Sequence, residues 1–212
     1  GLRKDIADKC SAGILSEYHL QTSDEKSTVA DVLKGLPKLR SGLSKSKDGP
    51  EEWRAAAAEA FKQAAEACAG DNSVAKVHKT LLSYASRISA SDLLTRFSDT
   101  LVKAQDAELS KWLTDPELKV LPNHETRGHM ESDLARYAFA SVFAELFDRS
   151  PKAGEFPVGL APDHDNWKSG NFADRFKVQC WKSPSSTVTS HISKDGHYFI
   201  HPDPAQCRSL TV

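Results

Sequence analysis

The chain has 212 residues, with 28 Lys and Arg against 29 Asp and Glu and a formal net charge of −1 at pH 7. This balance excludes a polybasic protein that binds nucleic acid through its overall field, so any DNA contact must come from a local patch. Hydrophobic residues make up 39%, as in globular proteins, and no apolar run is long enough to span a membrane. The four cysteines form no CxxC pair, so we expect no zinc ribbon. Scattered cysteines in a sequence without a signal peptide pattern indicate a cytoplasmic protein.

The first region, residues 1–49, combines weak structural signals with a basic loop. Residues 1–8 have the character of a strand end, and 27–33 have a short helical pattern. The loop at 34–47 has no acidic residue, and its basic residues are Lys34, Lys38, Arg40, Lys45 and Lys47. One interpretation is a solvated loop. The other is a contact with DNA phosphates, for which the candidates are Lys38, Arg40 and Lys45.

The second region, residues 50–118, is predicted to be helical. Pro50 favours a helix start, because proline suits the first helical position. An apolar stripe at helical spacing follows, made of Trp53, Ala57, Phe61, Ala64, Ala65 and Cys68. Gly70 is expected to end this helix. The next stripe contains Val74, Val77, Leu81, Tyr84 and Ile88, and a third helix is expected over about 91–113.

The third region, residues 119–212, is predicted to combine one buried helix with a β-hairpin. The helix covers about 130–148 and is apolar on more than one face. Alternating residues and a turn signal predict a hairpin over 186–201. A first strand is predicted at 176–181. The hairpin itself is predicted to consist of a strand at 187–192, a turn at Asp195-Gly196 and a returning strand that starts at 198–200.

These predictions define an α+β fold, in which the N-terminal two-thirds are mostly helical and a small antiparallel β-sheet lies at the C-terminal end. No catalytic motif accompanies it, because GxSxG, GxxxxGK[ST] and GxGxxG are all missing from the sequence. His124 and His129 are five residues apart, whereas two zinc ligands on one helix face need a spacing of four. We therefore expect no metal site. A metal-dependent hydrolase using His124, His129 and His164 is kept as an alternative.

Two motifs near the C-terminus carry a family resemblance. Pro184–Thr189 is a Pro-Ser-x-Thr-x-Thr segment, and Arg208–Thr211 is an Arg-x-Leu-Thr run. Together with 123–137, 156–167 and the opening residues 1–6, they resemble bacterial DNA cytosine-5 methyltransferases. In that family the second motif continues into an Arg-Glu helix start, before which this chain stops. The resemblance therefore implies a fragment that spans the target recognition region up to the start of the last conserved block.

The resemblance also implies how the work is divided in the parent enzyme. Family members bind S-adenosylmethionine through a Gly-rich loop, flip a cytosine out of the duplex, attack its C6 with a Pro-Cys thiolate and methylate C5. This chain contains neither a Pro-Cys nor a Glu-Asn dipeptide. We therefore expect no catalytic residue, no cofactor in the fragment and no activity of the fragment alone. Its expected partners are double-stranded DNA and the catalytic domain of the same enzyme, with no membrane involved.

Candidate DNA-facing residues in the third region follow from the matched motifs and from residue type. They are Arg127, His129, Ser185, Thr187, Thr189, Lys194 and Arg208. Hydroxyls and cations suit phosphate or base contacts, but strand hydroxyls, a solvated turn lysine, a helix-capping turn and a structural arginine are the corresponding alternatives. The alternative function is a helical protein-interaction module of a restriction or phage-defence system, with helices 50–113 as the partner surface.

Overall fold

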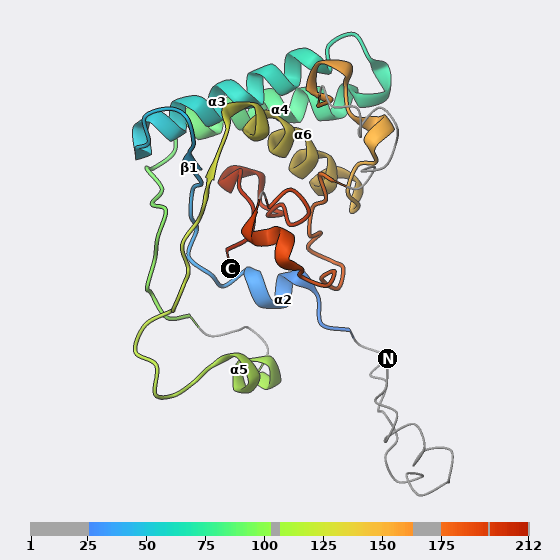
Figure 1. Cartoon of the computed structure of the whole chain (residues 1–212). Helices are drawn as coiled ribbons and strands as arrows, with labels where there is room; N and C mark the ends of the chain where they lie inside the picture. Colours follow the sequence, from blue (N-terminus) through green and yellow to red (C-terminus); the bar gives the residue numbers. More distant parts are fainter. Residues whose placement is uncertain (1–25, 103–106, 163–174, 195, 212) are drawn as a thin grey trace, which may run out of the picture.

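A computed structural model describes residues 26–102, 107–162, 175–194 and 196–211. The helices α3 (Pro50–Ala67), α4 (Ala75–Ser89) and α6 (Glu131–Phe147) form its scaffold, and the C-terminal segment and α2 (Val29–Leu33) lie on the side away from α3 and α4 (Figure 1). The shorter elements are β1 (Gly42–Leu43), η1 (Asn72–Val74), α5 (Ala107–Leu113), β2 (Gly128–His129), η2 (Ala153–Glu155), η3 (Val158–Leu160), η4 (Ser190–Ser193) and η5 (Pro204–Gln206). The predictions for residues 1–8, for His164 and for Asp195 lie outside the described residues.

The first two predicted helices are confirmed. Helix α3 begins at Pro50, and its buried residues include the stripe members Trp53, Ala57, Phe61, Ala64 and Ala65. Gly70 follows the helix with a φ of +82°, a left-handed conformation that glycine adopts without a steric penalty. Helix α4 buries Val77, Leu81, Tyr84, Ala85 and Ile88. Because α3 packs against both α4 and α6, these stripes meet in one hydrophobic core.

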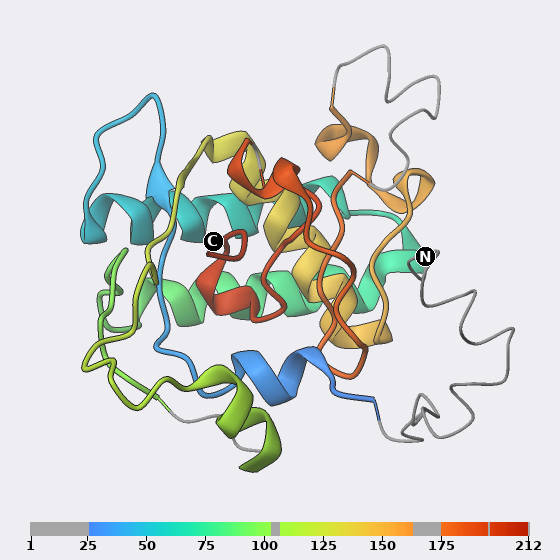
Figure 2. The ribbon, with the colours of Figure 1, turned by 60° about the horizontal axis from the view of Figure 1, so that its bottom comes forward.

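Helix α6 is buried on nearly every side, as its apolar pattern predicts. Its buried residues run from Asp133 to Ala144 with one half-buried position, Arg136. The α3–α4 pair covers one side, and the C-terminal segment with η5 covers another (Figures 1 and 2). Despite this apolar character, none of the helices in the described ranges is long and apolar enough to cross a membrane.

The prediction of a helix over 91–113 is wrong for its first half. In the described part of this range, 91–102 and 107–113, only α5 at Ala107–Leu113 is helical, and residues 95–99 run beside 121–126 instead. The amide of Thr126 donates to the carbonyl of Arg96 at 2.9 Å, and the amide of Ser98 donates to the carbonyl of His124 at 3.1 Å. These lateral hydrogen bonds satisfy the backbone that a helix would satisfy internally.

The predicted antiparallel hairpin over 186–201 is also wrong. Residues 190–193 form the 3-10 helix η4, and the neighbouring described residues contain only isolated bridges, parallel for Val178 with Ile200 and antiparallel for Ile200 with Ser209. The first bridge is parallel because the chain crosses over between 181 and 196 rather than returning through a tight turn. The alternating pattern at 187–192 therefore predicts a strand at a place where the described backbone pairs with no other strand.

The named sheet of the described chain is parallel and has two strands. Gly42 pairs with Gly128 and Leu43 with His129. Part of the basic loop is consequently internal, since Leu39, Arg40, Ser41 and Leu43 are buried. The interpretation of 34–47 as an entirely solvated loop is wrong for this stretch.

Candidate nucleic-acid interface

Three segments that are distant in sequence meet beside the β1–β2 pair. These are the basic loop, the loop that precedes α6, and the C-terminal Arg208–Thr211 motif. His124 joins all three, because its ring nitrogens lie 3.0 Å from the carbonyl oxygen of Pro37 and 3.3 Å from Oγ1 of Thr211. The amide of Leu39 adds a bond of 3.1 Å to Oε1 of Gln206. Two segments that carry the family resemblance, 123–137 and 208–211, are thus held to the basic loop by polar contacts.

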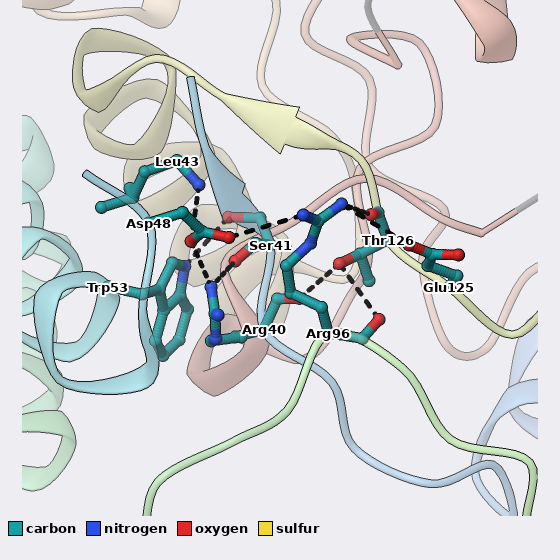
Figure 3. A network of polar contacts seen from close by, with 8 residues as sticks. All are labelled: Arg40, Ser41, Leu43, Asp48, Trp53, Arg96, Glu125 and Thr126. Carbon is teal, nitrogen blue, oxygen red and sulfur yellow. Dashed lines mark hydrogen bonds and ion pairs between the residues drawn. The ribbon is translucent and has the colours of Figure 1, made fainter. Parts of the chain in front are cut away.

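A second network fixes the basic loop against α3, where Nε1 of Trp53 donates to Oγ of Ser41 at 2.9 Å, and against Arg96 and Thr126 (Figure 3). Asp48 accepts hydrogen bonds from Nη1 of Arg40 at 2.6 Å and from the amide of Leu43 at 3.1 Å, and it forms an ion pair with Arg96 at 3.4 Å. Burial raises the pKa of Asp48, but hydrogen bonds from Arg40 and Leu43 and the charges of both arginines lower it overall. Arg96 also donates to the carbonyl of Thr126 at 2.6 Å. The network therefore keeps a carboxylate charged between two guanidinium groups.

Three of the predicted DNA-facing residues are buried in this chain. Arg40 is 5% exposed, His129 is 3% exposed and Arg208 is 2% exposed. The guanidinium of Arg208 donates to Oε1 of Gln206 and to the carbonyl of Ser209, with distances of 2.9 to 3.0 Å. Burial lowers the pKa of Arg208 to about 10, so the side chain stays charged at neutral pH. Arg40, His129 and Arg208 therefore lie beneath the surface and support it.

Burial also keeps His129 uncharged. Desolvation, together with the charges of Arg127, His197 and Arg208, lowers the pKa of His129 to about 3. Its Nε2 lies 3.1 Å from Oγ of Ser209 and accepts from the Ser209 amide at 3.3 Å. The neutral ring thus fastens β2 to the C-terminal motif.

Other predicted residues lie at the surface. The Lys38 side chain is 65% exposed, although its Nζ is 3.6 Å from Asp203. The exposed residues from the prediction are Lys38, Lys45, Ser185, Thr187, Thr189 and Lys194. Arg127 is half-buried, and its Nη1 donates to the carbonyl of Ile192 in η4 at 3.1 Å. The structure therefore connects Arg127 with the segment that ends at Lys194.

Sequence reasoning missed the residue that shapes the Pro-Ser-x-Thr segment. Gln179 is 3% exposed, and its Oε1 accepts from the Ser186 amide at 3.0 Å, from the Ser186 hydroxyl at 3.1 Å and from the Ser185 hydroxyl at 3.3 Å. Its Nε2 donates to the Tyr198 carbonyl at 3.1 Å and to Oγ of Ser186 at 2.9 Å. No local pattern singles out a glutamine between two apolar neighbours, so the sequence offers no signal for this role.

Metal-binding groups and reactive thiols were looked for among the described residues. They contain no group of three or more His, Cys, Asp or Glu side chains that could hold a metal ion. Burial raises the pKa of Cys68 to about 11 and also raises those of Cys180 and Cys207. A catalytic cysteine needs the opposite shift, because the thiolate is the nucleophile.

Comparison with known proteins relates part of this chain to the type II DNA methyltransferases. One relative is the type II methyltransferase M.Bpa9945I of Bacillus paralicheniformis, which is 49% identical over 90 residues. The match covers 42% of this chain and 19% of the relative, so the chain spans about a fifth of the protein that it matches. No family model matches the chain, and no solved structure matches it.

Proposed function

We propose that this chain is the DNA-recognition part of a DNA cytosine-5 methyltransferase. The observation that carries the proposal is the 49% identity with a type II methyltransferase over 90 residues. The cytosine-5 type is supported by the Pro-Ser-x-Thr-x-Thr and Arg-x-Leu-Thr motifs, which this chain places at 184–189 and 208–211. In such an enzyme the remaining part supplies S-adenosylmethionine binding and the nucleophile, and this part positions the duplex.

The geometry supports a division between buried and exposed residues in that role. Arg40, His129 and Arg208 are buried in the three converging segments, whereas the exposed candidates lie in the basic loop and in the segment 183–194. Lys38, Lys45 and Lys194 suit phosphate oxygens, and the hydroxyls of Ser185, Thr187 and Thr189 suit phosphate or base edges. Recognition then depends on a local patch, as a net charge of −1 requires.

The rival function, a protein-interaction module that uses helices 50–113, receives less support. The apolar stripes of α3 and α4 are buried against each other and against α6 rather than presented to a partner. The larger exposed apolar side chains of this stretch lie mainly around the irregular segment that precedes α5.

Selection of DNA by the 212-residue chain tests the proposal. The immobilised chain is incubated with a library of random double-stranded oligonucleotides at low salt, and bound duplexes are amplified over several rounds and sequenced. We expect enrichment of one short sequence family that contains a cytosine. Helix α4 provides a control, because substitution of its exposed Lys76 and Lys79 by Gln should leave the enriched sequence unchanged. No enrichment above the library background would refute the proposal.

A further inference from the structure

The segment from Ser183 to Lys194 carries the exposed residues 187–190, and two side chains from outside the segment hold its ends, the buried Gln179 at the first and the half-buried Arg127 at the second. Thr187, Val188 and Thr189 are exposed, with Val188 52% exposed. They have an extended or irregular backbone and belong to no sheet. A segment of this kind would sample many conformations unless the protein restrained it, and ordering it on DNA would cost binding free energy.

Gln179 supplies the restraint at the first end. Its side chain bonds Ser185 and Ser186 through Oε1 and reaches the Tyr198 carbonyl through Nε2. The backbone of Gln179 is itself fixed, because its N–H group donates to the carbonyl of Ile200 at 3.0 Å beside the Val178–Ile200 bridge. The amide of Val29 in α2 adds a bond of 2.9 Å to the Ser183 carbonyl. The start of the segment is therefore attached to buried structure.

Arg127 supplies the restraint at the second end. Its guanidinium donates to the Ile192 carbonyl at 3.1 Å, two residues before Lys194. Ile192 is buried, and its amide closes a turn onto the Thr189 carbonyl at 3.1 Å. Arg127 directly precedes β2, so the restraint leads back to the pairing with β1.

We infer that Gln179 and Arg127 are positioning residues for target selection, which hold Thr187–Thr189 in the conformation that reads the duplex. This inference rests on the proposed function and adds to it the residues on which sequence discrimination depends. Neither side chain needs to touch DNA. Gln179 cannot reach it from a buried position, and the nitrogen of Arg127 that bonds Ile192 is already used.

The test compares variants on the selected duplex and on a scrambled duplex of equal length, by fluorescence anisotropy over a range of salt concentrations. Gln179→Leu keeps the side-chain size and removes every polar contact of the amide. We expect its preference for the selected duplex to fall about tenfold, the loss expected for one misplaced base contact. Its affinity for the scrambled duplex and the salt dependence of that affinity should stay unchanged.

Two further variants separate positioning from direct contact. Ser186→Ala combined with Gln179→Leu should lose no more selectivity than Gln179→Leu alone, because both changes act through one contact. Arg127→Ala should lose selectivity without a change in the salt slope, whereas loss of a phosphate contact would reduce that slope by about one. A salt slope reduced by Arg127→Ala would overturn the inference for Arg127.

A stability control distinguishes positioning from general weakening of the fold. Leu81→Ala removes a fully buried side chain between α3 and α4, far from the segment in sequence, and should destabilise the chain without changing selectivity. Hydrogen exchange without DNA should show faster exchange at 183–189 in Gln179→Leu and not in Leu81→Ala. If the wild type selects a sequence but Gln179→Leu selects it equally well, the inference is wrong and the proposed function stands. If the wild type selects nothing, the proposed function itself fails and the inference fails with it.

Discussion

Gly196 lies at a position in the C-terminal segment where the structure leaves no room for a side chain. Its φ is +72°, and a Cβ there would lie 2.6 Å from the Cβ of Ser209. Gly196→Ala should therefore destabilise the chain by about 2–4 kcal/mol, through left-handed strain and overlap with a buried neighbour. Gly154→Ala is the control, because a Cβ at Gly154 meets nothing within 4 Å. Urea unfolding of both variants measures the difference, and equal stability would contradict this account of Gly196.

His129 predicts how the stability of the chain depends on pH. Because burial lowers its pKa from 6.5 to about 3, the unfolded chain takes up a proton below pH 6.5 that the folded chain does not. Stability should thus fall between pH 7 and pH 5, by roughly 2 kcal/mol from this residue, and should change little on its account above about pH 7. His124 and His201 have lowered pKa values as well and act in the same direction.

The variant His129→Gln isolates that contribution. Its free energy of unfolding should decrease less between pH 7 and pH 5 than that of the wild type. Ion-paired carboxylates interfere little in this window, because the Arg149 hydrogen bond lowers the pKa of Glu155 to about 2 and its contribution is lost only below its ordinary value of 4.5. Urea titrations at both pH values measure the change, and an identical pH dependence in the two proteins would refute the role of His129.

At the scale of elements, the ion-pair network of Asp48 joins the basic loop to the segments on either side. The Arg40 side chain is only 6% exposed, so removing its charged partner leaves a buried cation poorly compensated. Asp48→Asn should therefore cost about 1–3 kcal/mol of stability. Asp148→Asn is the matched control, because the Asp148–Lys182 pair is 57% and 76% exposed and such pairs contribute little. Thermal unfolding compares them, and a larger loss in Asp148→Asn would be contrary to expectation.

The contrast between helices and sheet shows which elements local sequence can predict. The apolar stripes of α3, α4 and α6 repeat over several turns, so the helical period can be recognised even where single positions depart from it. The β1–β2 pair has two residues in each strand and joins Gly42 to Gly128, so no repeat is long enough to detect. For the same reason the alternation at 187–192 was misleading, since a strand exists only where a partner accepts its hydrogen bonds.

The candidate site shows the same limit at the level of side chains. Residue type alone grouped Arg40 and Arg208 with Lys38 and Lys194, although the first two are buried and the last two are exposed. Which cations reach the surface depends on partners such as Asp48 and Gln206, which carry no motif of their own. Residue type therefore indicates which side chains could bind DNA but not which of them are exposed.

At the scale of the whole molecule, the distribution of charge predicts how DNA affinity depends on salt. The net charge of −1 provides no general attraction, so binding rests on a few local cations. With phosphate contacts from Lys38, Lys45 and Lys194, affinity for a duplex should fall about 40-fold between 50 and 200 mM salt, since each contact adds roughly −0.9 to the slope. Anisotropy titrations measure this slope.

Two triple variants with the same change in net charge separate a local patch from a general effect. Lys38→Gln, Lys45→Gln and Lys194→Gln together should flatten the salt dependence almost completely. Lys62→Gln, Lys76→Gln and Lys79→Gln alter exposed lysines on α3 and α4, the layer on the other side of α6 from the C-terminal segment (Figure 1). This second variant should keep the wild-type slope. Equal salt slopes in the two variants would mean that DNA affinity depends on net charge alone, which would exclude an interface built around the converging segments.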